Sequence, residues 1–399
     1  MLNSKELEKL KAKNYLIEGV NIFNVLAVKL YDASKLKMLK RAIFALFWKP
    51  ILVESSNGTG VLIFHGCKMK RRDDYDDMLS TLKGKLSQES DYVEVLERFS
   101  FVYMFKACFH FFKNLKIYPE LGVLKSIYIH ILYVQFSFIK DEVSNIFGEK
   151  KHVITFCDAH PYDNLCAQLA SKKNIKTYTI QHGQYRELST DFNPDVEVYK
   201  NFISDKLLCW GDKTKLEFIR LGVDESRLVV TGRFQRQSRG PEFEASLRLC
   251  TKHAVGVLFS GDNEVINKEM LKIIVQAASS LNLMIVLRLH PYDSICNYHN
   301  ELKGLNYKLE QGEFSGFVNS VDFCICHMTA AFLDVLKLGK VCFIYKDETL
   351  SSIFHNRELN FENSEDLISI SSLKNSKNIK CIYKEYVSTL ANVINLEGL

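Results

Sequence analysis

The sequence is short of residues that break regular structure, with six prolines and 19 glycines in 399 residues. These numbers exclude a collagen-like or loop-dominated chain, and a content of 47% hydrophobic and 25% charged residues is typical of a globular protein. A net charge of only +5 is too small to indicate nucleic-acid binding, so we expect no nucleic-acid partner. Because domains commonly span about 150 residues, the length predicts two or three of them.

The sequence also lacks paired cysteines, an apolar leader and a long apolar run. Its 11 cysteines are an odd number and form no C-x-x-C pair, which is typical of a protein kept in a reducing compartment. The N-terminus MLNSKELEKLKAK is too polar for a signal peptide. The longest uncharged apolar run, Ser126–Ile139, is too short to cross a bilayer. We therefore expect a cytoplasmic protein.

Residues 35–50, KLKMLKRAIFALFWKP, have the pattern of a basic amphipathic helix. Leu36, Leu39 and Ile43 recur at helical spacing, and basic residues occupy the other side. Such a helix either turns its apolar side to the protein core or lies on an anionic membrane surface. If the helix lies on a membrane, we expect the protein to make peripheral contact with the cytoplasmic face of the inner membrane.

Several well-known catalytic motifs are absent. The chain has no GxxxxGK[ST] loop, no GxGxxG after a strand, no GxSxG elbow and no HExxH helix. P-loop ATPases, ordinary dehydrogenases, serine hydrolases and zincin proteases are therefore disfavoured. The acidic run at 73–77 resembles metal-binding carboxylates, but acidic residues are also favoured in the first turn of a helix, and no further ligands accompany it. We expect neither a metal nor another cofactor.

Helical patterns dominate the first part of the chain, and alternating strands and helices follow from residue 152. Residues 1–50 and 99–147 are predicted to be helical, the latter as two long helices, while Val61–His65 is a short apolar run typical of a buried strand. Predicted helices follow at 163–173, 212–221, 264–281 and 329–338. The further predicted strands are 152–157, 176–180, 206–210, 227–232, 254–260, 283–290, 321–327 and 341–345.

A polar stretch at 233–246 separates the strand–helix units into two series. Its Gly240-Pro241 pair is typical of a linker. Two such series predict an α/β fold of two Rossmann-like, doubly wound domains that face a cleft. We place the domains at residues 1–235 and 236–399, the second ending in a terminal helix over 378–396.

Polar, histidine-bearing turns follow most predicted strands, where ligands bind in open α/β sheets. In the C-terminal domain, His290 can donate a hydrogen bond to a phosphate while Pro291 fixes the turn, and Arg288 points to the same side. Thr329 opens a helix whose free amides can cradle a phosphate. The alternatives are a histidine that satisfies local backbone groups and a threonine that only caps its helix. His327 and Asp334 complete the candidates in this domain.

In the N-terminal domain, Asp158 is the first candidate for a general base, because partial burial at a strand end would raise its pKa towards a useful value. His182 is the alternative base, oriented by Asp163 or Glu187. Gly183, which permits close approach of a ligand, and Arg233 complete the candidates in this domain.

The segments DAHPYDNLCAQLASKKNIKTYTIQHGQY, CWGDKTKLEFIRLGVDESRLVVTGRF, RLHP and CHMTAAFLDVLKLGKVCFIY together resemble GT-B glycosyltransferases of bacterial surface-polysaccharide assembly. They are similar to capsule-synthesis transferases, sialyl- and polysialyltransferases and CDP-glycerol glycerophosphotransferases. The resemblance implies that His290 and Thr329 hold the donor's phosphates and that Asp334 holds its ribose. It also implies that a carboxylate, Asp158, activates the acceptor. The chain departs from the family at Met328-Thr329-Ala330, which keeps one hydroxyl where two are usual.

The partners that this resemblance implies are a nucleotide-sugar donor, with CMP-sugars favoured over UDP-sugars, and a glycan or lipid-linked glycan acceptor. No metal is implied. Three rival functions stay open: transfer of a polyol phosphate from a CDP-polyol, epimerisation of a sugar nucleotide, and a non-catalytic scaffold in a membrane-bound assembly complex. Only the first of these rivals needs an acceptor.

Overall fold

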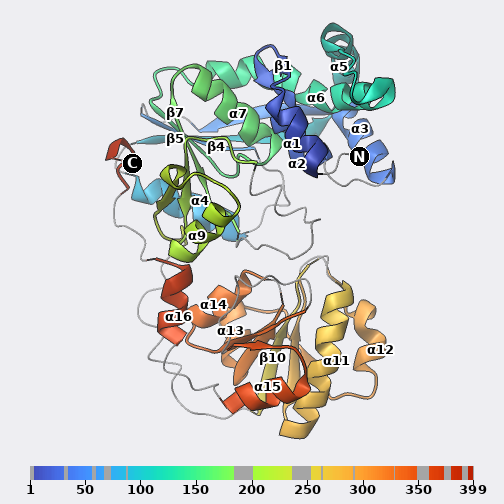
Figure 1. Ribbon diagram of the computed structural model, residues 1–399, viewed down its shortest axis with the longest axis vertical. Helices are drawn as coiled ribbons and strands as arrows, with labels where there is room; N and C mark the ends of the chain where they lie inside the picture. Colours follow the sequence, from blue (N-terminus) through green and yellow to red (C-terminus); the bar gives the residue numbers. More distant parts are fainter. Residues whose placement is uncertain are drawn as a thin grey trace. The chain divides into compact units, whose positions relative to one another are not determined.

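The computed structural model folds into two compact units (Figure 1). Unit 1 comprises Met1–Tyr185, Phe192–Arg236 and Ser388–Leu399, and unit 2 comprises Arg186–Asp191 and Gln237–Val387. The residues that the structure describes are 4–30, 35–55, 60–66, 73–86, 89–183, 201–235, 253–261, 264–290, 293–327, 329–347, 359–372, 379–388 and 394–398.

Unit 1 is built on one sheet, in which seven strands are described. Most are short apolar runs buried on both faces, the pattern of a parallel sheet covered by helices. All neighbours pair in parallel except the edge strand β3, which runs antiparallel to β5. In order across the sheet the strands are β3 (Trp48–Ser55), β5 (Ser90–Phe99), β4 (Val61–His65), β6 (His152–Thr155), β7 (Lys176–Ile180), β8 (Lys206–Cys209) and β9 (Leu228–Val230).

Helices cover both faces of this sheet, with α6 and α7 on one side and α4 on the other in Figure 1. α6 and α7 form much of the core, together with α2 and the inward residues of β4 and β6. A two-stranded hairpin, β1 (Leu16–Ile17) and β2 (Val20–Asn21), precedes α2. The helices described in this unit are α1 (Ser4–Ala12), α2 (Ile22–Leu30), α3 (Lys35–Phe47), α4 (Asp73–Lys85), α5 (Phe101–Asn114), α6 (Gly122–Asn145), α7 (Pro161–Lys172) and α9 (Asp212–Arg220).

Unit 2 holds a parallel sheet of six described strands, with α11 and α12 on one side and α13 and α14 on the other in Figure 1. Its strand order is β12 (Tyr307–Leu309), β11 (Met284–Arg288), β10 (Ala254–Leu258), β13 (Phe323–Cys326), β14 (Cys342–Tyr345) and β15 (Asn360–Phe361). Its described helices are α11 (Glu264–Leu281), α12 (His299–Leu302), α13 (Phe314–Asn319), α14 (Ala331–Lys337), α15 (Ser364–Ile370) and α16 (Ile379–Tyr386).

The prediction of two doubly wound α/β domains with a helical N-terminal region is confirmed by these sheets. The prediction of helix through residue 50 is wrong, because β3 begins at Trp48. β5 was not predicted because charged residues interrupt it, as its sequence SDYVEVLERF shows. The predicted terminal helix is also too long, since α16 ends at Tyr386 and Ile394 instead forms a β-bridge with Leu86 in unit 1.

α6 is the one described helix that is long and apolar enough to cross a membrane. Within unit 1 it is a core helix, because Ile129, Leu132, Phe136 and Ile139 are buried in the main apolar cluster. The length and the apolar composition of α6 are therefore explained by its packing inside unit 1.

Candidate functional site

Each sheet has a point where the strand order reverses, and the loops leaving the two central strands diverge there. In unit 1 this point lies between β4 and β6, and in unit 2 between β10 and β13. Counted from β10, unit 2 has the order 3-2-1-4-5-6, that of dinucleotide-binding domains. Ligands bind in such crevices beyond the carboxyl ends of the strands. Each unit therefore has one position at which a site is expected.

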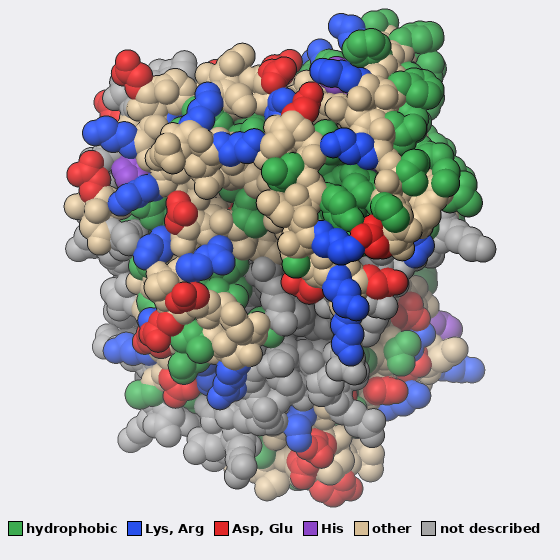
Figure 2. Space-filling view, turned by 45° about the horizontal axis from the view of Figure 1, so that its top comes forward, with side chains coloured by type: hydrophobic (Ala, Val, Ile, Leu, Met, Phe, Trp, Pro, Cys, Tyr) green, Lys and Arg blue, Asp and Glu red, His purple; other side chains and the backbone are tan. Residues whose placement is uncertain are grey.

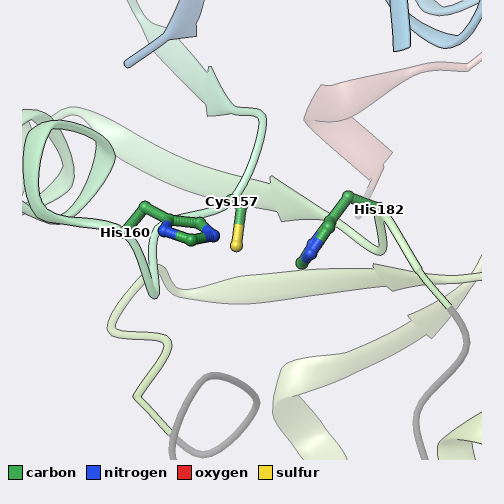
Figure 3. Close-up of side chains that lie close together, drawn as sticks. All are labelled: Cys157, His160 and His182. Carbon is green, nitrogen blue, oxygen red and sulfur yellow. The ribbon is translucent and has the colours of Figure 1, made fainter. Parts of the chain in front are cut away.

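At the unit 1 position, a thiol and two imidazoles lie together, and we call Cys157, His160 and His182 the unit 1 cluster. Their ligand-capable atoms all lie within 4.8 Å of one another. Figure 3 shows the Cys157 sulfur between the two imidazole rings. Cys157 and His160 follow β6, and His182 follows β7, so the parallel pairing of β6 with β7 brings them together.

Aromatic rings surround this cluster and exclude water from part of it. The Phe156 ring lies 5.8 Å from His182 and 4.8 Å from both Tyr75 and His65. Burial, with a smaller contribution from the neighbouring His65, lowers the pKa of His160 to about 4, so its imidazole is neutral at neutral pH. Neutral imidazoles can accept a proton from a substrate, and together with a thiolate they can also bind Zn²⁺.

Asp158 lies beside this cluster in sequence, and one oxygen of its carboxylate is held by the backbone, while Oδ1 has no hydrogen-bond partner among the described residues. It is 1% exposed, and Oδ2 accepts hydrogen bonds from the N–H groups of Ile203 (2.9 Å) and Ser204 (2.6 Å). Burial raises its pKa. The contacts are those of a residue that anchors the segment leading into β8.

The carboxylate of Asp163, which was predicted to orient His182, also binds backbone N–H groups. Its carboxylate accepts hydrogen bonds from the N–H groups of Gly66 (3.0 Å), Phe156 (3.1 Å) and Cys157 (3.3 Å). It thereby ties together the ends of β4 and β6 and positions Cys157. Burial holds its pKa well above the usual value. The other predicted partner of His182, Glu187, lies outside the described residues.

The turn that carries His182 is held by a buried tryptophan. Trp210 donates from its backbone N–H to Oε1 of Gln181 (2.7 Å) and from Nε1 to the Gln181 carbonyl (2.8 Å). A Cβ at Gly183 would meet no described atom within 4 Å, so this glycine is not required by close packing there. The guanidinium of Arg233 stacks on Trp210, 4.6 Å from the ring. Arg233 therefore lies beside the residue that positions His182.

In unit 2, two histidines follow strands near the point of reversal, His290 after β11 and His327 after β13. His290 packs on the turn after β10, where a Cβ added to Gly261 would lie 2.6 Å from its Nδ1, so only glycine fits. His327 follows β13 and its side chain is fully buried, with Nε2 3.1 Å from Oδ1 of Asp347. Its Nδ1 finds no hydrogen-bond partner among the described residues. The predicted residue Pro291 lies outside the described part of the chain.

The other predicted residues of this unit have local roles or lie apart from the two histidines. Thr329 Oγ1 accepts a hydrogen bond from the Ala331 N–H at 3.3 Å, which is a helix-start contact. Arg288 donates to the Gly312 carbonyl at 2.8 Å and stacks over Phe314, so its charge is directed towards α13. Asp334 lies on the first turn of α14 and is partly buried.

A buried polar network that was not predicted ties the loop after β10 to the loop after β11. Asn267 of α11 donates to the Ser260 carbonyl (2.8 Å) and to the hydroxyl of Tyr298 (3.0 Å). Tyr298 in turn donates to Asp293, whose backbone N–H donates to the His290 carbonyl at 2.8 Å. An asparagine at a helical position carries no signal of such a role in one sequence, because its partners are distant along the chain.

The tetrapeptide HPYD occurs at 160–163 and at 290–293, and the two copies act differently. In the first, His160 is the N-cap residue and Pro161 the first residue of α7, and the aspartate binds backbone N–H groups. In the second, the aspartate binds Tyr298. The strands that precede them, β6 and β11, also occupy different places in their sheets. The repeat therefore does not indicate equivalent sites.

Comparison with known proteins finds no matching family model and no matching curated protein. Among solved structures, the chain is similar to the UDP-GlcNAc 2-epimerase of Methanocaldococcus jannaschii in complex with UDP-GlcNAc and UDP, with 14% identity, a TM-score of 0.46, and coverage of 80% of this chain and 94% of that one. It is also similar to S. aureus MnaA with UDP, with 11% identity, a TM-score of 0.48, and coverage of 84% and 94%. Anabaena Alr3699/HepE with UDP shows 11% identity, a TM-score of 0.47, and coverage of 82% and 95%. A likeness at such identities concerns the fold and not the activity.

Proposed function

We propose that the protein is a metal-independent glycosyltransferase that moves a sugar from a nucleotide-activated donor to a surface-polysaccharide or lipid-linked glycan acceptor. The observation that carries the proposal is the dinucleotide-type strand order of unit 2, with His290 packed on the turn after β10 beside the point of reversal. Imidazole N–H groups there can donate to the donor's phosphate. The donor is a CMP-sugar, with UDP-sugars as the alternative, and this preference rests on the sequence resemblance.

In this proposal His182 of the unit 1 cluster is the general base. Asp158 is less suited, because its carboxylate already accepts two backbone hydrogen bonds. The acceptor hydroxyl loses its proton to His182 as its oxygen bonds to the anomeric carbon, and the bond from that carbon to the phosphate oxygen breaks. His290 stabilises the charge on the leaving phosphate.

The first experiment is a thermal-shift panel of CMP, CDP, UDP, GDP and ADP with the wild type and the variant His290→Ala. A nucleotide at a hundred times its Kd should add about 2.7 kcal/mol to the stability of the wild type. We expect this gain to be lost in His290→Ala. It should persist in the control His299→Ala, whose histidine is exposed on α12 of the same unit. If none of the nucleotides raises the melting temperature, even with glycan and lipid present, the result would favour the non-catalytic scaffold.

The second experiment is product analysis with and without a glycan acceptor. Glycosyl transfer consumes the donor and lengthens the acceptor, whereas an epimerase isomerises the donor alone and a polyol phosphotransferase adds phosphorus to the acceptor. His182→Gln should lower kcat by about 10²- to 10⁴-fold. Asp158→Asn should cost stability but change kcat of the folded protein by less than about tenfold, since its role is to hold the backbone. A larger loss of kcat in Asp158→Asn than in His182→Gln would instead make Asp158 the base.

A further inference from the structure

α5 turns most of its apolar residues to the outside of unit 1. Phe101, Val102, Phe105, Phe109 and Phe112 are between 64% and 73% exposed, whereas Tyr103 and Ala107 on the opposite side are buried. The helix is well formed at its start, where the Tyr103 N–H donates to the capping Ser100 hydroxyl at 3.2 Å. A helix of a globular protein normally shows the opposite arrangement.

α3 extends this apolar surface. It packs beside α5, and its Phe47 ring lies 6.1 Å from Phe101 in edge contact. Leu36, Leu39 and Ile43 of α3 are between 46% and 62% exposed, so the apolar side predicted from the sequence faces outward rather than towards the core. We call the exposed apolar residues of the two helices the α3–α5 face: Leu36, Leu39, Ile43, Phe101, Val102, Phe105, Phe109 and Phe112. Figure 2 shows hydrophobic side chains gathered at its upper right, where α5 lies in Figure 1.

The charged residues on the two helices of this face are of one sign. α3 and α5 contain no aspartate or glutamate, and they carry six lysine and arginine residues. Lys37, Lys40 and Lys106 are exposed. Lys113 is paired with Glu18 at 3.4 Å. The surface therefore combines aromatic residues with the exposed positive charge of Lys40 and Lys106.

We propose that the α3–α5 face docks unit 1 onto an anionic lipid bilayer. Phenylalanines enter the boundary between headgroups and acyl chains, and the flanking lysines bind lipid phosphates. A second copy of the chain is a weaker candidate, because a two-fold symmetric contact through this face would bring its lysines against each other without carboxylates to neutralise them. The proposal depends on neither the donor nor the reaction proposed above.

The test is co-sedimentation of the full-length protein with vesicles of phosphatidylcholine alone or mixed with phosphatidylglycerol. We expect binding to the mixed vesicles that weakens with added salt. Phe105→Glu/Phe109→Glu should weaken it at least about tenfold, because two large apolar groups no longer leave water. The matched control is Leu216→Glu/Val265→Glu, which alters two residues with exposed fractions of 56% and 70% outside the face. It should bind as the wild type does.

Two outcomes would overturn the proposal. One is a wild type that stays in the supernatant with both kinds of vesicle. The other is a dimer, measured by analytical ultracentrifugation, that Phe105→Glu/Phe109→Glu converts to a monomer without any vesicle binding by the wild type. Circular dichroism and the melting temperature show whether each variant is folded. The nucleotide panel run on the same variants keeps a failure of membrane binding distinct from a failure of the proposed function.

Discussion

Burial changes the acid–base chemistry of individual histidines in unit 1. His130 of α6 is 1% exposed, stacks on Tyr118, and accepts a hydrogen bond from the Lys116 N–H at 3.0 Å through Nε2. Loss of hydration disfavours the charged ring and lowers the pKa of His130 to about 4, as it does for His160. Both rings are therefore neutral where an exposed histidine would begin to gain charge.

We expect His130→Gln to gain stability relative to the wild type as the pH falls from about 6.5 to about 4. In this range the unfolded wild type binds a proton at residue 130 and the folded protein does not, so protonation favours unfolding of the wild type only. The glutamine can still accept the Lys116 hydrogen bond. Urea unfolding of both proteins at several pH values measures the difference.

The pH dependence of the wild type alone would not isolate His130, because Asp158 and Asp163 change the stability in the opposite direction. Burial raises the pKa of both carboxyl groups. Each takes up a proton in the folded state first, which favours folding as the pH falls. A stability difference between His130→Gln and the wild type that stays constant with pH would contradict the prediction.

The unit 1 cluster makes a second prediction at this scale. Its thiol and imidazoles match the ligands that Zn²⁺ prefers, so we expect added Zn²⁺ to inhibit the proposed transfer by occupying His182, while chelators leave the rate of that reaction unchanged. Co²⁺ should give a thiolate charge-transfer band that Cys157→Ser abolishes. Cys296→Ser, which alters an exposed cysteine of unit 2, should retain it. A chelator that abolishes activity would show that the enzyme needs a metal.

At the scale of elements, the end of β4 and the start of α7 approach closely at one glycine. A Cβ at Gly66 would lie 2.3 Å from Cβ of Tyr162 and 2.7 Å from the Asp163 carboxylate. The same aspartate binds the Gly66 N–H. The contact therefore ties the end of β4 to the start of α7, whose N-cap residue is His160 of the unit 1 cluster.

Gly66→Ala should destabilise the protein by about 2 kcal/mol or more, because backbone and a buried carboxylate must shift. The matched control is Gly84→Ala in α4, where an added Cβ meets nothing within 4 Å. It should be neutral or stabilise by up to about 1 kcal/mol, since alanine favours the helix. Denaturant unfolding compares the two, and equal effects would mean that the approach at Gly66 is not tight.

At the scale of the whole molecule, the chain leaves unit 1 and returns to it at the C-terminus. The Ser388 N–H donates to the Trp210 carbonyl at 2.8 Å, and the Ile394 N–H donates to the Lys85 carbonyl at 2.7 Å. Tyr178 donates to the Leu396 carbonyl at 2.9 Å, and the side chains of Ile394 and Leu396 are buried. The last residues therefore complete one face of the unit 1 sheet.

Deleting residues 388–399 should destabilise unit 1 by about 3 kcal/mol or more, because two buried apolar side chains and their hydrogen bonds are lost. Hydrogen exchange followed by peptide mapping locates the effect. We expect faster exchange in β7 and α4 and unchanged exchange in the sheet of unit 2, which serves as the control within the same molecule. Faster exchange in unit 2 alone would place the C-terminus with that unit.

The sequence alone was enough to predict α5, α6, α7, α9, α11 and α14 and the buried strands of both sheets, because a strand covered on both faces is an apolar run wherever it occurs. The shorter helices α12, α13 and α15 were not predicted. Position at a strand end likewise identified His182, His290 and His327. The edge regions were not predictable in this way: β3 and β5 carry charges because they are less enclosed.

Only the tertiary structure decided what each polar residue at a strand end does. In sequence Asp158 is a candidate base and Asp163 a candidate partner of His182, but each carboxylate accepts hydrogen bonds from backbone N–H groups distant along the chain. The association of Cys157 with His182 depends on the pairing of β6 with β7, and the exposure of α5 depends on which side packs against α6. Periodicity in a sequence marks the apolar side of a helix and the end of a strand, whereas the partners of both are set by contacts between residues far apart in the chain.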